Sequence, residues 1–118
     1  MAKGALYIRW GFPTPALAER AVREFAEAME YWKRKQEEKM IDSFEAVFLD
    51  YIGGDLSGFL LIRGDREKLN KIRMDPEFES RNQKVALLVP NFGVVDAFIG
   101  EDLQRRMTQY QQALAQVS

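Results

Sequence analysis

The sequence of 118 residues contains no histidine and no cysteine. Without imidazole or thiolate groups, it cannot build a Ser-His-Asp or Cys-His catalytic site, a histidine-ligated haem or an ordinary zinc site. Carboxylate, tyrosine, lysine, arginine and tryptophan side chains remain for chemistry. We therefore predict that the chain holds no cofactor of its own.

Long apolar runs and an excess of one charge are also missing. The 17 basic and 18 acidic residues give a net charge of −1, and no basic stripe indicates a nucleic acid or an anionic membrane as partner. The longest apolar run, residues 85–89, is too short to cross a bilayer. The first ten residues lack the features of a signal peptide, so we expect a cytoplasmic protein.

The length and the apolar content of 47% predict one domain over residues 1–118. Alternation of Leu6, Ile8 and Trp10 predicts a strand at 5–12. Thr14 and Pro15 then favour a helix start. The helix that follows carries an apolar stripe with steps of three and four, formed by Ala18, Val22, Phe25, Met29 and Trp32.

Further strands are predicted at 44–52, 59–63 and 92–99, with Asp65 capping a helix after the third strand. Asp75–Pro76 interrupts and restarts that helix. A last helix has an apolar stripe at Leu103, Met107, Tyr110, Leu114 and Val117. The glycine-rich segment 53–58 joins two strands and opens no helix, which favours a plain turn over a phosphate site.

The order β-α-β-β-α-β with an extra C-terminal helix predicts an α+β, ferredoxin-like fold. Its antiparallel four-stranded sheet has the order 4-1-3-2, and both crossover helices cover one face. The other face is expected to carry apolar residues, namely Tyr7, Val47 or Phe48, Phe59 or Leu60, Val94 and Phe98. So much exposed apolar surface favours a homodimer in which two sheets pack face to face.

Three segments carry a family resemblance that extends over nearly the whole chain: GFLLIRGD at 58–65, DPEF at 75–78 and NFGVVDA at 91–97. With this element order, the chain resembles the dimeric α/β-barrel superfamily, above all its small uncharacterised bacterial members. Characterised relatives include cofactor-free monooxygenases, lactone isomerases, haem-degrading enzymes and ligand-binding modules. The haem-degrading branch uses a histidine that this chain lacks, so the resemblance transfers no haem site.

The candidate ligand-binding residues are Tyr7, Arg9 and Asp96, which are polar residues within predicted strands. In the predicted strand order, Arg9 and Asp96 meet across the sheet, with Tyr7 on the same face as Arg9. One interpretation is a structural ion pair. The other is a pocket in which Arg9 holds an anionic or enolate-like ligand while a carboxylate or Tyr7 moves a proton.

Two functions stay open. The first is a cofactor-free, oxygenase- or isomerase-like enzyme acting on a small aromatic or polyketide-like molecule. The second is a non-catalytic module that binds a small ligand or acts through its dimer surface. A cavity between sheet and helices lined by Tyr7, Arg9 or Asp96 favours the enzyme, whereas a filled core with these side chains paired favours the module.

Overall fold

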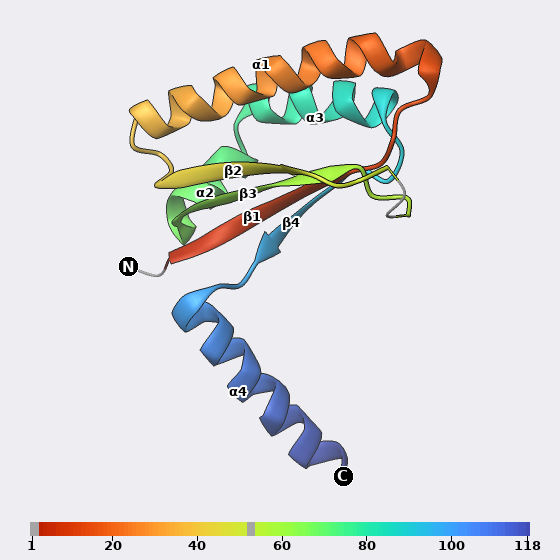
Figure 1. Cartoon of the computed structure of the whole chain (residues 1–118). Helices are drawn as coiled ribbons and strands as arrows, with labels where there is room; N and C mark the ends of the chain where they lie inside the picture. The colour runs from red at the N-terminus through yellow and green to blue at the C-terminus, as the bar shows by residue number, and fades with distance from the viewer. Residues whose placement is uncertain (1–2, 52–53) are drawn as a thin grey trace.

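The computed structural model describes residues 3–51 and 54–118 and shows one antiparallel sheet with helices layered over one of its faces (Figure 1). The elements follow the chain as β1 (Lys3–Trp10), a 3-10 turn (Pro15–Leu17), α1 (Ala18–Glu37), β2 (Ser43–Phe48), β3 (Gly58–Asp65), α2 (Arg66–Arg73), α3 (Pro76–Leu88), β4 (Gly93–Ala97) and α4 (Gly100–Val117). Helix α4 extends away from the sheet (Figure 1).

The sheet has the order β2-β3-β1-β4, and each pair of neighbours is antiparallel. This confirms the predicted order 4-1-3-2 and the ferredoxin-like arrangement with an extra C-terminal helix. Strands β2 and β4 form separate edges, so the sheet of one chain is open. The barrel of the predicted fold class is therefore not closed within a single chain.

Strand lengths differ from the sequence-based ranges because cross-strand pairing decides where each strand ends. Strand β3 continues to Asp65, which pairs with Lys3 of β1. Strand β2 ends at Phe48, opposite the first residue of β3, Gly58. Residues 52 and 53, at the end of the predicted second strand and in its turn, lie outside the described residues.

The helix restart at Asp75–Pro76 is confirmed. The Asp75 carboxylate accepts a hydrogen bond from the backbone N–H of Glu77 at 3.2 Å, and Pro76 occupies the first helical position. Thr14 and Asp65 also stand at N-cap positions, before the 3-10 turn and α2. Neither side chain makes a capping hydrogen bond within the part of the chain that the structure describes.

The core lies between the sheet and the helices. Its buried side chains come from every layer: Leu6, Ile8, Tyr31, Trp32, Ile41, Leu60, Ile62, Leu69, Ile72 and Phe78. Trp32 is 2% exposed and stacks edge-on against Tyr31 and Phe78. Trp10 is partly buried against the same cluster. Alternation along β1 therefore identifies its buried face correctly. The predicted stripe of α1 reaches the core at Phe25, Met29 and Trp32, but Val22 is 68% exposed.

The opposite face of the sheet carries Tyr7, Val47, Phe59, Leu61 and Val95, which share one side by strand register. α1 and α3 lie on the other side of the sheet (Figure 1). Leu61 and Phe59 are half-buried, and Val95 is 52% exposed. We call this surface the open face.

Some residues predicted for the open face lie elsewhere. Val94 pairs with Ile8 and packs against the core, so its neighbour Val95 takes the outward position. Phe98 lies beyond the end of β4, and the guanidinium of Arg106 sits 3.9 Å from its ring centre. Phe48 and Leu60, the alternatives to Val47 and Phe59, face the helices.

Helix α4 leaves its apolar stripe exposed, at Leu103, Met107, Tyr110, Leu114 and Val117. No helix among the described residues is both long enough and apolar enough to cross a membrane.

Candidate functional site

A cavity of about 290 Å³ lies between the sheet and helices α1 and α3. Its wall is chiefly apolar and aromatic, and it opens to solvent on one side. The sheet contributes Ile8, Trp10, Phe48 and Leu60 to this wall. We call this cavity the helix-side pocket.

Three aromatic rings form a cluster in the wall of the pocket. The ring centres of Phe25 and Phe48 are 4.9 Å apart, and that of Trp10 lies 5.7 Å from Phe25. Phe48 meets Trp10 edge-on and is 67% exposed, which places it at the rim. Such a cluster offers flat apolar area to a planar molecule.

The pocket also has a polar edge, formed by Glu24 of α1 and Arg81 of α3. The Glu24 side chain is 13% exposed, and its Oε1 atom is buried. Within residues 3–51 and 54–118, this oxygen has no hydrogen-bond partner. Arg81 Nη1 lies 3.6 Å from it, which is an ion-pair distance but too long for a hydrogen bond.

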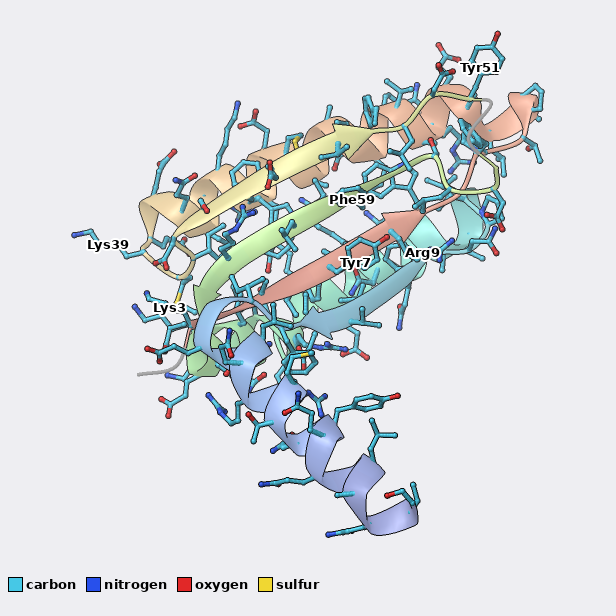
Figure 2. All side chains as sticks on the ribbon, turned by 60° about the horizontal axis from the view of Figure 1, so that its bottom comes forward. Lys3, Tyr7, Arg9, Lys39, Tyr51 and Phe59 are labelled. Atoms are coloured by element: carbon cyan, nitrogen blue, oxygen red, sulfur yellow. The ribbon has the colours of Figure 1, made fainter. Side chains whose placement is uncertain are left out.

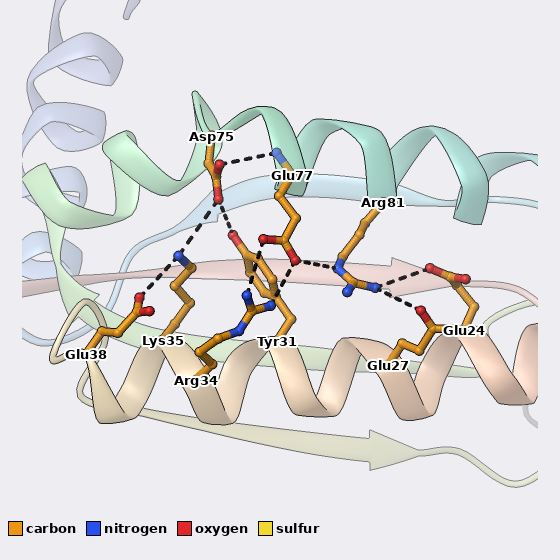
Figure 3. A network of polar contacts seen from close by, with 9 residues as sticks. All are labelled: Glu24, Glu27, Tyr31, Arg34, Lys35, Glu38, Asp75, Glu77 and Arg81. Carbon is orange, nitrogen blue, oxygen red and sulfur yellow. Dashed lines mark hydrogen bonds and ion pairs between the residues drawn. The ribbon is translucent and has the colours of Figure 1, made fainter.

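Polar contacts join α1 to α3 beside the pocket (Figure 3). The Tyr31 hydroxyl donates to Asp75 Oδ2 at 2.9 Å, and Arg34 donates to Glu77 at 2.8 Å. Arg81 donates through Nε to the same Glu77 carboxylate at 3.4 Å. These contacts hold the two helices together over the sheet and thereby fix the position of the pocket wall.

Three of these groups have shifted pKa values: Tyr31, Glu77 and Arg34, whose guanidinium pKa is raised by its hydrogen bond to Glu77. Burial raises the pKa of the Tyr31 hydroxyl above the ordinary tyrosine value, and the hydrogen bond to Asp75 raises it further. The hydrogen bonds from Arg34 lower the pKa of the Glu77 carboxyl. Tyr31 is thus a neutral phenol at physiological pH, and its hydroxyl keeps its proton while donating a hydrogen bond to Asp75. This arrangement suits a structural donor better than a proton-transfer group.

The predicted ligand-binding residues Tyr7 and Arg9 lie on the open face and not in the helix-side pocket (Figure 2). The Tyr7 ring packs against Phe59 with 5.4 Å between ring centres. The Arg9 Nε atom is buried and has no hydrogen-bond partner among the described residues. Ligand binding by Tyr7 and Arg9 stays a prediction.

Asp96 lies on the other side of the sheet, so the predicted meeting of Arg9 with Asp96 is wrong. Register pairs Arg9 with Gly93 and Asp96 with Leu6. Leu6 and Arg9 are an odd number of residues apart on one strand, so their side chains point to opposite faces. Asp96 instead forms ion pairs with two arginines of α2, Arg66 at 3.1 Å and Arg73 at 3.2 Å.

Sequence reasoning missed Glu24 and Arg81 because charged residues on amphipathic helices usually face solvent. One signal was available. Glu24 stands three residues after Ala21 and four before Ala28, so it falls within the inward face that these alanines share. Among the described residues, no group of three or more acidic side chains is arranged to hold a metal ion.

No protein-family model matches the sequence, and no curated protein matches it significantly. Solved structures do match. A dimeric ferredoxin-like protein of unknown function from Jannaschia sp. is 15% identical, with a TM-score of 0.62 over 81% of this chain and 99% of that one. Rv0793 from Mycobacterium tuberculosis is 22% identical, with a TM-score of 0.62 over 84% of this chain and 96% of that one.

A third match is SnoaB, a cofactor-independent oxygenase from Streptomyces nogalater. It is 15% identical, with a TM-score of 0.61 over 85% of this chain and 97% of that one. At these identities the similarity establishes the fold and not the activity. It confirms the predicted ferredoxin-like fold.

Proposed function

We propose that this protein is a homodimer that binds a small, mainly apolar ring compound, aromatic or polyketide-like, in the helix-side pocket. The observation that carries the ligand-binding part is the cavity of about 290 Å³ with its aromatic wall. Ligand pockets in proteins commonly measure roughly 300–1,000 Å³, so this one is suited to a molecule of one or two rings. Apolar area removed from water contributes roughly 25 cal/mol per Å² to such binding.

The homodimer is supported by the open face and by α4. Both present apolar side chains without cover, including Val95 on the sheet and Met107 on the helix. The similar protein from Jannaschia sp. is described as dimeric. A second copy that packs on the open face would remove this area from water, and a stable dimer needs an interface of roughly 1,000 Å² or more.

A second candidate function is cofactor-free, oxygenase- or isomerase-like catalysis on the same bound molecule. The fold shared with the oxygenase from Streptomyces nogalater supports it. Glu24 also supports it. Its carboxylate lies in the pocket wall, and its Oε1 atom accepts no hydrogen bond from a described residue, so it could act as a general base toward a bound substrate. Binding is the more general property, so it is tested first.

The test fills the pocket without changing the sheet. Ala28 of α1 lines the pocket, whereas Ala26 on the same helix is exposed and does not. Wild type, Ala28→Trp and Ala26→Trp are screened by thermal shift against one- and two-ring aromatic compounds. We expect compounds that raise the Tm of wild type and Ala26→Trp through mass action but leave folded Ala28→Trp unchanged.

Two results would contradict the proposal. In the first, no compound raises the Tm of the wild type. In the second, compounds raise the Tm of Ala28→Trp by as much as that of the wild type. Circular dichroism establishes that both tryptophan variants are folded before the screen is interpreted.

A further inference from the structure

The Glu24 carboxylate is exceptional in the pocket wall, which is otherwise mainly apolar. Its Oε1 atom is buried and accepts no hydrogen bond from any described residue. A buried acceptor without a donor is unfavourable, because folding has removed the water that would otherwise bind it. A bound molecule that supplies the missing donor would therefore gain affinity at this point.

Arg81 does not satisfy Glu24, because its guanidinium is shared among three carboxylates. Its Nε atom is 3.4 Å from Glu77, and its Nη1 atom is 3.6 Å from both Glu24 and Glu27 (Figure 3). Arg34 also binds the Glu77 carboxylate, at 2.8 Å. Three carboxylates and two guanidiniums leave this end of the pocket with an excess of negative charge.

We propose that Glu24 accepts a hydrogen bond from the ligand, which makes the ligand a planar apolar molecule with a hydroxyl or N–H donor at one end. This inference rests on the proposed function and names its ligand class: phenol-like compounds and aromatic amines. The apolar body lies against Phe25, Trp10 and Phe48, while the donor group reaches the Glu24 end.

The same geometry predicts which molecules the pocket rejects. A ring compound without a donor leaves the Glu24 oxygen unpaired. A ring compound with a carboxylate brings a second negative charge next to Glu24, where the only neighbouring cation among its described contacts, Arg81, is already shared. The pocket thus distinguishes three compounds that have one ring system in common: 2-naphthol, naphthalene and 2-naphthoate.

The experiment measures the Kd values of these three compounds for the full chain by isothermal titration calorimetry. We expect wild type to bind 2-naphthol about tenfold or more tightly than naphthalene, since a hydrogen bond to a charged acceptor has at least this effect. 2-Naphthoate should bind most weakly. Glu24→Leu should bind 2-naphthol and naphthalene with similar Kd values, and Glu24→Gln should show a severalfold smaller preference than wild type.

The matched control is Glu27→Gln. Glu27 also lies 3.6 Å from Arg81, but it is 58% exposed and does not line the pocket. Glu27→Gln removes one negative charge near Arg81, as Glu24→Gln does. We expect it to retain the wild-type preference for 2-naphthol.

Each other outcome has a definite meaning. If naphthalene and 2-naphthol bind wild type equally, and Ala28→Trp abolishes both, the pocket binds ligands but this inference is wrong. If none of the three binds, and the aromatic screen also finds no ligand, both proposals fail. If Glu24→Leu does not fold, an unchanged 2-naphthol preference in Glu24→Gln overturns the inference.

Discussion

The two faces of the sheet carry similar side chains and differ in what covers them. On the helix-covered face, Leu6 and Ile62 are fully buried, and the charged groups of α1 and α3 are joined by ion pairs. On the open face, Val95 is half exposed, and Arg9 has a buried Nε atom without a partner among the described residues. One chain therefore completes its core on one side of the sheet only.

This difference separates two kinds of stability. The helix-covered face determines whether the chain folds, because its apolar area is already removed from water within one molecule. We expect the open face to determine whether the chain associates, because only a second molecule could remove its apolar area from water. Substitutions on the two faces should consequently change different measured quantities.

The largest expected effect is on the helix-covered face. Trp32→Ala removes a side chain that is 2% exposed and in contact with Tyr31 and Phe78. It should lower the free energy of unfolding by about 3–5 kcal/mol, measured by urea denaturation. The control Tyr51→Ala, at an 80% exposed position, should change it by less than about 0.5 kcal/mol. A loss for Trp32→Ala as small as that of the control would contradict the core assignment.

A smaller effect on folding but a large one on association is expected at Val95. Val95→Asp places a charge within the proposed interface, where a second copy would have to remove it from water. The chain should remain folded, and the dimer Kd from sedimentation equilibrium should rise at least about tenfold.

Leu87→Asp is the control for Val95→Asp. Leu87 is 81% exposed on α3, in the helix layer, and an acid there should leave the dimer Kd unchanged. A wild-type protein that sediments only as monomer at micromolar concentration, or a Val95→Asp variant that dimerises normally, would show that the open face is not the interface.

The sequence predicts the element order and the cap at Asp75 because these features depend on local patterns, and the sheet order follows from the element order and right-handed crossovers. Period-two alternation identifies the inward face of β1, where Leu6 and Ile8 alternate with Tyr7 and Arg9. It cannot do so for β4, because Val94 and Val95 are both valine. There the register with β1 decides which valine points inward, and register is a property of two strands that neither strand's sequence contains.

The same limit explains why the predicted site at Tyr7, Arg9 and Asp96 is not one site. Neighbouring strands were predicted correctly, but a shift of one residue in register moves a side chain to the opposite face. The sequence names a cavity between sheet and helices as the feature that would favour an enzyme, but it does not predict whether this cavity exists. Its volume depends on how small residues such as Ala21 and Ala28 meet the sheet, and only the packed structure contains that information.

The smallest expected effect comes from a single hydrogen bond beside the contact between α1 and α3. Tyr31→Phe removes the hydrogen bond to Asp75 and should lower the free energy of unfolding by about 1 kcal/mol at pH 7. Asp75 keeps its bond from the Glu77 N–H and lies 3.9 Å from Lys35, so the substitution leaves no isolated charge.

This effect should also depend on pH with a definite sign. Folding raises the pKa of Tyr31 above its ordinary value of 10.0, so above pH 10 the unfolded chain releases the hydroxyl proton while the folded chain retains it. The stabilisation is complete below that pH and decreases as pH rises, because the folded state then binds more protons than the unfolded state. Urea denaturation at pH 7, 9 and 10.5 should therefore show that the wild type loses more stability than Tyr31→Phe between pH 9 and 10.5. Lysine ionisation affects both proteins and cancels in the difference. The control Tyr51→Phe, at an 80% exposed position, should follow the wild type throughout. A constant difference between wild type and Tyr31→Phe up to pH 10.5 would mean that the Tyr31 hydroxyl is not buried against Asp75, and that α1 and α3 are held together by their arginine–carboxylate pairs alone.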